Sequence, residues 1–163
     1  MSEQLSKQEN SQFVIFTLFH NNKKEKYGIE INQVKEIREL ENITPVPNSP
    51  KFLKGIMNLR GRIIPIIDIK EKLGLNSEQK NNNSLVLIGE FKENFAGFLV
   101  DEVDKVMRAS KKDIEHEKTE FIKSSYVKGI AKISENIIMI LDLEKLLEES
   151  ILTNIQEKTI QDE

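Results

Sequence analysis

The chain has 163 residues, a formal net charge of −3 and no cysteine. This length suits one compact domain or two small fused ones, and the lack of cysteine excludes disulfides and thiolate metal sites. The mildly acidic balance argues against a binder of duplex nucleic acid, which normally carries a basic face.

Residues 1–12 are polar and carry both charge signs, so we expect a flexible leader and no secretory signal. The longest unbroken apolar run, Ile137–Leu141, is far shorter than the ~20 residues that a membrane helix needs. These features, with the absence of cysteine, predict a cytoplasmic protein.

The first half of the chain predicts short strands. Residues 13–19 are rich in β-forming side chains, and residues 27–31 alternate between apolar and polar, so both segments are expected to be strands. Asn32 is a suitable helix N-cap, and Val34 and Ile37 stand three apart, which favours a short helical turn there.

Prolines break any regular element between Ile43 and Lys51, and Ser49-Pro50 can start one more helical turn. Residues 56–69 are typical of a hairpin that turns at Gly61. A short helix over residues 71–73 should stop at Gly74. Residues 76–83 hold no core-forming side chain and are the expected linker.

The pattern then restarts. Residues 85–88 and 95–100 predict two strands, residues 111–123 a polar loop, and residues 126–133 with 137–143 a final hairpin. Leu143, Leu146, Leu147 and Ile151 share one helical face, which indicates an amphipathic C-terminal helix. A polar tail, residues 151–163, is expected to fray.

The two halves are copies of each other. Residues 28–37 align with residues 97–106, and residues 52–73 align without a gap with residues 126–147, where eight of 22 positions are identical. Random pairing would give roughly one or two identities, and self-similarity at a fixed offset is the mark of repeated architecture.

The duplication predicts a mostly β fold of two barrels, each of about five short strands with tight turns. The first repeat is assigned to residues 13–75 and the second, with the C-terminal helix, to residues 84–150. The copies differ at one hairpin, where Asn58-Leu59-Arg60-Gly61-Arg62 faces Lys132-Ile133-Ser134-Glu135-Asn136. The two arginines there are either solvated side chains or a specific contact.

No catalytic, cofactor-binding or metal-binding motif is found. The two histidines, His20 and His116, lie beside a turn and in a polar loop without motif partners, and no phosphate-binding glycine loop occurs. Asp68 and Asp142 hold equivalent positions just before a helix, where an N-cap role explains both. The sequence therefore predicts a protein that binds other proteins and is not an enzyme.

Residues 53–68, with residues 27–37 before them, closely resemble the CheW family of chemotaxis coupling proteins. Residues 97–103 and 140–143 are similar to the second half of that family, so the resemblance covers roughly Gln12 to Glu149. It implies two five-stranded SH3-like barrels in one CheW-like domain over residues 13–150.

The resemblance also implies partners and no cofactor. The family links the cytoplasmic tip of chemoreceptors, in membrane receptor clusters, to the regulatory domain of the histidine kinase CheA, and related barrels join side by side in arrays. A receptor tip is a helical hairpin, which suits an apolar groove between the barrels.

By resemblance, that groove is lined by Val34, Leu85, Val86 and Val106, although each of these residues also fits plain core packing. Asn58 lies in the partner-facing hairpin. Arg60 and Glu36 are hypothesised to form an ion pair that fixes this hairpin and preforms the groove.

Two alternatives stay open on the sequence alone. One is a scaffold of the same family that serves a different chemosensory pathway, and the other is a small β-barrel that binds nucleic acid or a small ligand. The acidic charge and the lack of a stacking surface count against the second.

Overall fold

The computed structural model describes residues 10–75, 84–115, 125–133 and 135–147. Eleven strands make up most of this part of the chain, with two short α-helices and two 3-10 turns. In chain order the elements are β1 Asn10–His20, β2 Lys23–Glu30, η1 Ile31–Gln33, β3 Glu36–Glu39, β4 Leu53–Leu59, β5 Arg62–Asp68, α2 Ile69–Lys72, β6 Leu85–Phe91, β7 Asn94–Val100, β8 Glu102–Ser110, η2 Lys111–Asp113, β9 Ile114–Glu115, β10 Val127–Ile133, β11 Asn136–Leu141 and α3 Leu143–Leu147.

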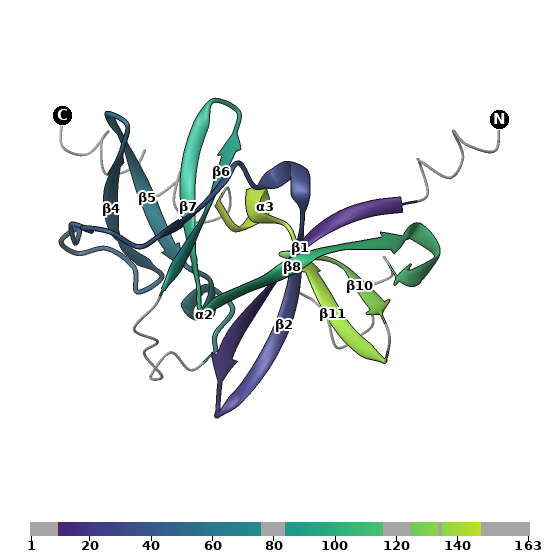
Figure 1. Cartoon of the computed structure of the whole chain (residues 1–163). Coiled ribbons are helices and arrows are strands. Elements are labelled where there is room, and N and C mark those ends of the chain that lie inside the picture. The colour runs from purple at the N-terminus through teal and green to yellow at the C-terminus, as the bar shows by residue number, and fades with distance from the viewer. Residues whose placement is uncertain (1–9, 76–83, 116–124, 134, 148–163) are drawn as a thin grey trace.

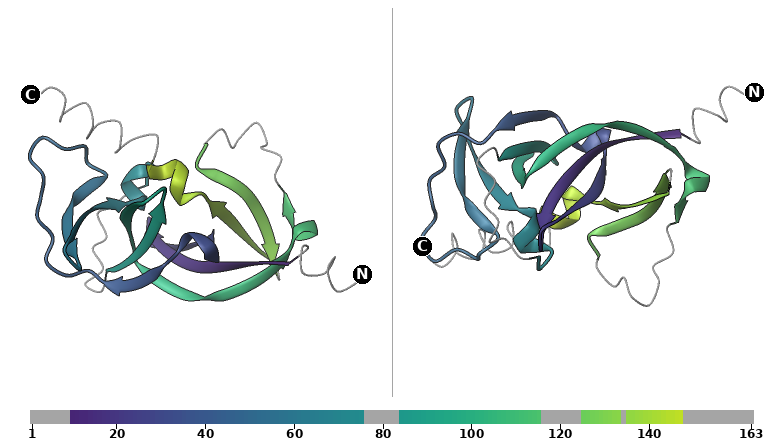
Figure 2. Two further views of the ribbon diagram at one scale, coloured as in Figure 1. Left: turned by 90° about the horizontal axis from the view of Figure 1, so that it is seen from above. Right: turned by 60° about the horizontal axis from the view of Figure 1, so that its bottom comes forward.

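The strands form two curled sheets that correspond to two SH3-like barrels, as expected. Barrel A has the order β8-β1-β2-β11-β10-β9, and barrel B has the order β3-β6-β7-β5-β4. The barrels lie at opposite ends of the molecule with α2 and α3 between them (Figures 1 and 2). Barrel A has one strand more than expected, because β9 adds two residues beside β10.

The barrels do not coincide with the two sequence repeats, and the predicted division at residues 76–83 is wrong in this respect. Strand β2 pairs in parallel with β11, and β5 pairs in parallel with β7. Each barrel therefore combines the first two strands of one repeat with the later strands of the other: β1 and β2 join β8 to β11 in barrel A, and β6 and β7 join β3 to β5 in barrel B. Barrel B is continuous in sequence, from Glu36 to Val100, whereas barrel A is built from residues on both sides of it.

Three hydrophobic clusters hold this arrangement together. A central cluster combines side chains from both barrels and both helices, among them Phe16, Ile29, Phe98 and Leu146. Each barrel also has a cluster of its own. The cluster of barrel A contains Phe13, Ile15, Ala109, Ile114, Ala131, Ile138 and Ile140, and that of barrel B contains Met57, Leu59, Ile64, Ile66, Val86 and Ile88.

Several predicted elements are confirmed, and others are corrected. Only residues 31–33 are helical where a turn through Ile37 was expected, and Glu30, not Asn32, is the N-cap residue. Residues 36–39 form β3 instead, because they pair along β6 and tertiary contacts override local propensity. The expected leader ends earlier, since residues 10–12 already belong to β1.

Strand β8 follows β7 after Asp101 and was not assigned from the sequence. Residues 50–53 form a single turn, closed by the Leu53 N–H donating to the Pro50 carbonyl over 3.1 Å. The predicted linker 76–83, most of the polar loop 111–123, the end of the C-terminal helix and the tail 151–163 lie outside the described residues.

Candidate partner-binding site

The hairpin between β4 and β5 turns at Arg60 and Gly61, whose φ angles are 50° and 85°. Two successive positive φ angles are typical of the type I′ turns that match the twist of paired strands. The Asn58 side-chain oxygen accepts a hydrogen bond from the Gly61 N–H at 3.0 Å. Asn58, predicted to bind a partner, is exposed. Because of this hydrogen bond, its side chain also holds the turn that presents Arg60.

Arg60 and Glu36 form the predicted ion pair. The Arg60 Nη2 lies 3.2 Å from each carboxylate oxygen of Glu36, and the Arg38 Nη1 lies 3.6 Å from Oε1 of the same carboxylate. Strands β3 and β4 are the two edges of the barrel B sheet. The pair therefore spans the line along which this barrel closes, and it leaves the Arg60 side chain 73% exposed.

The predicted groove residues separate into three environments. Val34 and Leu85 are partly buried and pack against the central cluster. Val86 is fully buried inside barrel B, so its assignment to the groove is wrong. Successive residues of a strand point to opposite faces, and Leu85 and Val86 therefore cannot both face the groove. Val106 is half exposed on β8, paired with Val14.

Val103, which was not selected from the sequence, packs against the central cluster together with Val34 and Leu85. It aligns with Val34 in the repeat, so the duplication itself contained the signal. The border of the central cluster thus contains one equivalent valine from each repeat.

Two exposed isoleucines were also missed. Ile63 is 71% exposed and Ile137 is 67% exposed, and the two align in the repeat. Each lies in a shallow hollow beside the parallel strand pair of its barrel. The hollow at Ile137 measures about 420 Å³ and is lined by residues 24–27, Asn136 and Met139. The hollow at Ile63 measures about 330 Å³ and is lined by Arg62, residues 64–65, residues 93–95 and Leu147.

Two ionisable groups near these surfaces are perturbed. Burial, with the acceptor Glu25 beside it, raises the pKa of Tyr27, whose hydroxyl donates to the Glu25 carboxylate over 3.0 Å. Burial also raises the pKa of Asp68, against the opposing effect of Lys54. The predicted N-cap role of both repeat aspartates is confirmed, because Asp68 accepts from the Lys70 N–H and Asp142 from the Glu144 N–H.

Within the described residues, no group of three histidine, aspartate or glutamate side chains is placed to hold a metal ion. No helix in this part of the chain is long and apolar enough to span a membrane. The described surface features are two hollows of mixed polar and apolar lining, partly buried apolar side chains around the central cluster, and an exposed ion pair.

A family model described as a CheW-like domain matches residues 12–150. The chain belongs to the CheW-like family. Its relatives include the chemotaxis protein CheW of Klebsiella aerogenes, 35% identical over 139 residues that cover 83% of this chain and 81% of the relative. The chemotaxis protein CheW of Thermotoga maritima is 34% identical over 124 residues, which cover 75% of this chain and 80% of the relative.

A solved structure agrees with these sequence relatives. The scaffolding protein TtCheW from Thermoanaerobacter tengcongensis is similar with a TM-score of 0.75 and 36% identity, covering 84% of this chain and 87% of that one. The CheW-like family is one of scaffolds and adaptors, and the chain is a chemotaxis coupling adaptor. The resemblance stated from residues 53–68 is confirmed.

Proposed function

We propose that the chain works in the cytoplasm as a non-catalytic scaffold that couples chemoreceptor cytoplasmic tips to the histidine kinase CheA and joins membrane receptor clusters through those tips. The observation that carries the proposal is the family match over residues 12–150. The named relatives are chemotaxis proteins, which favours chemotaxis over another chemosensory pathway.

The receptor tip is assigned to the seam between the barrels. Val34, Leu85 and Val103 are apolar and only partly buried there. An amphipathic helix docks by laying its apolar face in such a groove. The half-exposed Val106 on β8 offers a further apolar contact for a helix that extends beyond the seam.

CheA and other CheW-like barrels are assigned to the hollows at Ile63 and Ile137. These isoleucines are exposed, apolar and equivalent in the two repeats. The regulatory domain of CheA shares the fold of this family, so it can present matching hollows, and two related barrels can then pack side by side. The Arg60–Glu36 pair lies on the Ile63 barrel, where it holds the β4–β5 hairpin against β3.

Co-sedimentation of the chain with a receptor cytoplasmic fragment and CheA, scored for kinase activation, tests the proposal. We expect a ternary complex and an activated kinase. Ile63→Asp should release CheA while the receptor still binds, and Val34→Asp should do the reverse. Lys112→Asp, at an exposed position of the turn η2 that lines neither hollow, is the matched charge control. Absence of any ternary complex with the unaltered chain would refute the coupling function.

The ion pair is tested by exchanging its charges. Arg60→Glu and Glu36→Arg should each weaken complex formation, and the double exchange should restore it, because the role assigned to the pair is to hold the hairpin. An exposed ion pair contributes at most about 1 kcal/mol to stability, so the melting temperature should hardly change. If the single variants bind as the unaltered chain does, the pair has no part in binding.

A further inference from the structure

Within the described residues the chain passes between the barrels twice. It leaves barrel A after β2 and enters barrel B at β3, through residues 31–35. It returns from β7 to β8 through Asp101 alone. These two crossings are equivalent positions of the sequence repeat, since Asn32 aligns with Asp101. The bonds made at the crossings therefore contribute, beside the central cluster, to how the two barrels are oriented.

The crossing at Asp101 contains a buried ion pair. Asp101 and Lys70 are 5% and 6% exposed, and the Lys70 Nζ lies 2.9 Å from one carboxylate oxygen and 3.2 Å from the other. The same carboxylate accepts the Phe19 N–H of β1 at 2.7 Å, and the Asp101 N–H donates to the Thr17 carbonyl. Asp101 thus joins helix α2, which follows β5 of barrel B, to strand β1 of barrel A.

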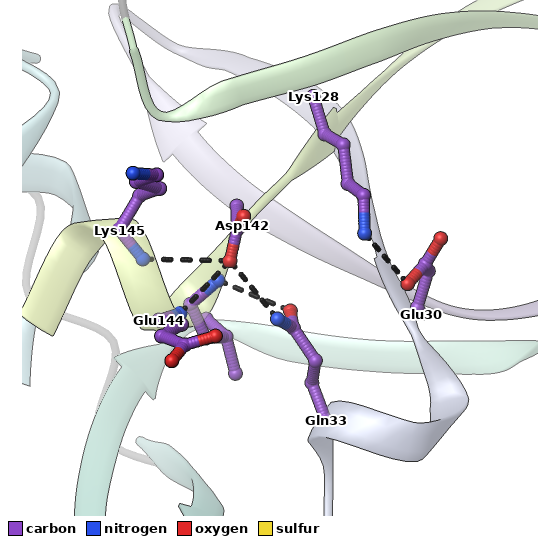
Figure 3. Close-up of polar contacts among 7 residues, drawn as sticks. Glu30, Gln33, Lys128, Asp142, Glu144 and Lys145 are labelled. Atoms are coloured by element: carbon purple, nitrogen blue, oxygen red, sulfur yellow. Dashed lines mark hydrogen bonds and ion pairs between the residues drawn. The ribbon is translucent and has the colours of Figure 1, made fainter. Parts of the chain in front are cut away.

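The other crossing has no equivalent pair, because Asn32 and Glu144 occupy the positions aligned with Asp101 and Lys70. A neutral side chain makes the connection instead (Figure 3). The Gln33 amide donates to the Asp142 carboxylate at 2.9 Å and accepts from the Leu143 N–H at 3.1 Å. Nearby, Lys128 and Glu30 form an exposed ion pair at 2.8 Å.

The ion pair at one crossing and the amide hydrogen bonds at the other respond differently when the barrels move relative to each other. Separating a buried ion pair leaves two charges without partners in a medium of low polarity, which costs far more than an amide exchanging its hydrogen bonds for water. A rotation of the barrels that separates Lys70 from Asp101 is therefore strongly opposed. A rotation that loosens the partly buried contacts of Gln33 is opposed less.

We propose that Lys70 and Asp101 are a positioning pair that fixes the relative orientation of the two barrels, and that the crossing at residues 31–35 is the yielding side. The barrels rock about Asp101, so the border at Val34 moves more than the border at Val103. This proposal concerns the chain alone and holds whichever partner occupies the seam.

Distances between spin labels on the two barrels test the proposal. The chain has no cysteine, so labels attach only where cysteine is introduced, at the exposed positions Glu90 on β6 and Arg108 on β8. The unaltered orientation should give a narrow distance distribution. Lys70→Met should broaden it and lower the melting temperature by roughly 10 °C, as expected when one partner of a buried pair is removed.

A double variant separates orientation from stability. Lys70→Met with Asp101→Asn removes both charges but keeps an oxygen for the Phe19 N–H, so the melting temperature should recover. The distance distribution should stay broad, because the bond that fixed the angle is gone. A narrow distribution in this variant would overturn the proposal, even if Lys70→Met alone does not fold.

Lys54→Met is the matched control. Lys54 pairs with the buried Asp68 at 3.6 Å, but both residues belong to barrel B. Loss of the Lys54 charge should leave the distribution of distances between the two spin labels unchanged. Broadening equal to that of Lys70→Met would overturn the special role of the crossing.

Discussion

Barrels A and B have the same order of equivalent strands, apart from the additional β9 in barrel A, but are assembled differently from the chain. Barrel B is drawn from one continuous stretch, and barrel A closes only when residues on both sides of that stretch meet. Each has a hydrophobic cluster of its own, yet both contribute to the central cluster. Duplication thus produced equivalent geometry in the two barrels, while the shared cluster makes them one cooperative unit.

The largest expected effect comes from the shared cluster. Phe98 is fully buried there, and Phe98→Ala should destabilise the protein by about 3–5 kcal/mol, through lost burial and the cavity left behind. Urea unfolding followed by circular dichroism measures this loss. Amide hydrogen exchange should accelerate in both barrels, although the altered residue lies on a strand of barrel B.

The matched variants are Ile66→Ala and Ile140→Ala, at aligned positions in the separate clusters of barrels B and A. Each should cost about 2–5 kcal/mol, with exchange accelerating first in its own barrel. Equal acceleration in both barrels for these variants, or acceleration confined to barrel B for Phe98→Ala, would contradict the distinction between shared and separate clusters.

A smaller effect is expected where the parallel strands approach. A β-carbon at Gly97 would lie 2.6 Å from both Ile66 Cδ1 and Val86 Cγ1, whereas at the aligned Gly28 it would lie 2.8 Å from Ile140 Cδ1. Val86 is stiff because it branches at Cβ, while the end of Ile140 can rotate. Gly97→Ala should therefore cost about 1–3 kcal/mol and Gly28→Ala less, as thermal unfolding can measure. The reverse order would contradict this reading of the two strand pairs.

The smallest expected effect is electrostatic and depends on pH. Burial raises the pKa of Asp68, so between its unfolded and folded pKa values the folded state binds more protons and stability falls as pH rises. Asp68→Asn keeps an acceptor for the Lys70 N–H and should be slightly more stable than the unaltered chain at neutral pH. The urea unfolding midpoints of the unaltered chain and of Asp68→Asn should converge near pH ~4, close to the ordinary pKa of aspartate. A constant difference across this range would exclude titration of Asp68 as its cause.

Much of this architecture could be predicted from the residues. The aligned Lys-Gly-Ile segments and the two aspartates predicted the repeat, the hairpins and the N-cap residues of both helices, although α2 begins at Ile69 and not at residue 71. The Arg60–Glu36 pair was also predicted and is present. Local patterns were sufficient there because strands, turns and caps are set mainly by neighbours in sequence.

The exchange of strands between the repeats could not be predicted in this way. Residues 36–39 form a strand because β6 lies beside them, and the local sequence pattern of the segment does not predict that pairing. Val86 was placed at the groove by the family resemblance, and its apolar character alone could not show that it belongs to the core of barrel B. The exposed Ile63 and Ile137 were missed for the same reason, since only the folded sheet decides which apolar side chains face solvent.

The sequence of barrel B lies between two parts of the sequence of barrel A, and this arrangement sets the order in which the barrels can form during synthesis. The ribosome delivers all of barrel B once Val100 has emerged, but barrel A has to wait for β11, which ends at Leu141. Until then β2, with the apolar side chains of Tyr27 and Ile29, has no strand partner on one side. The last strands to be made are therefore the ones that cover the first, and nascent chains cut short before β11 expose an edge that invites aggregation.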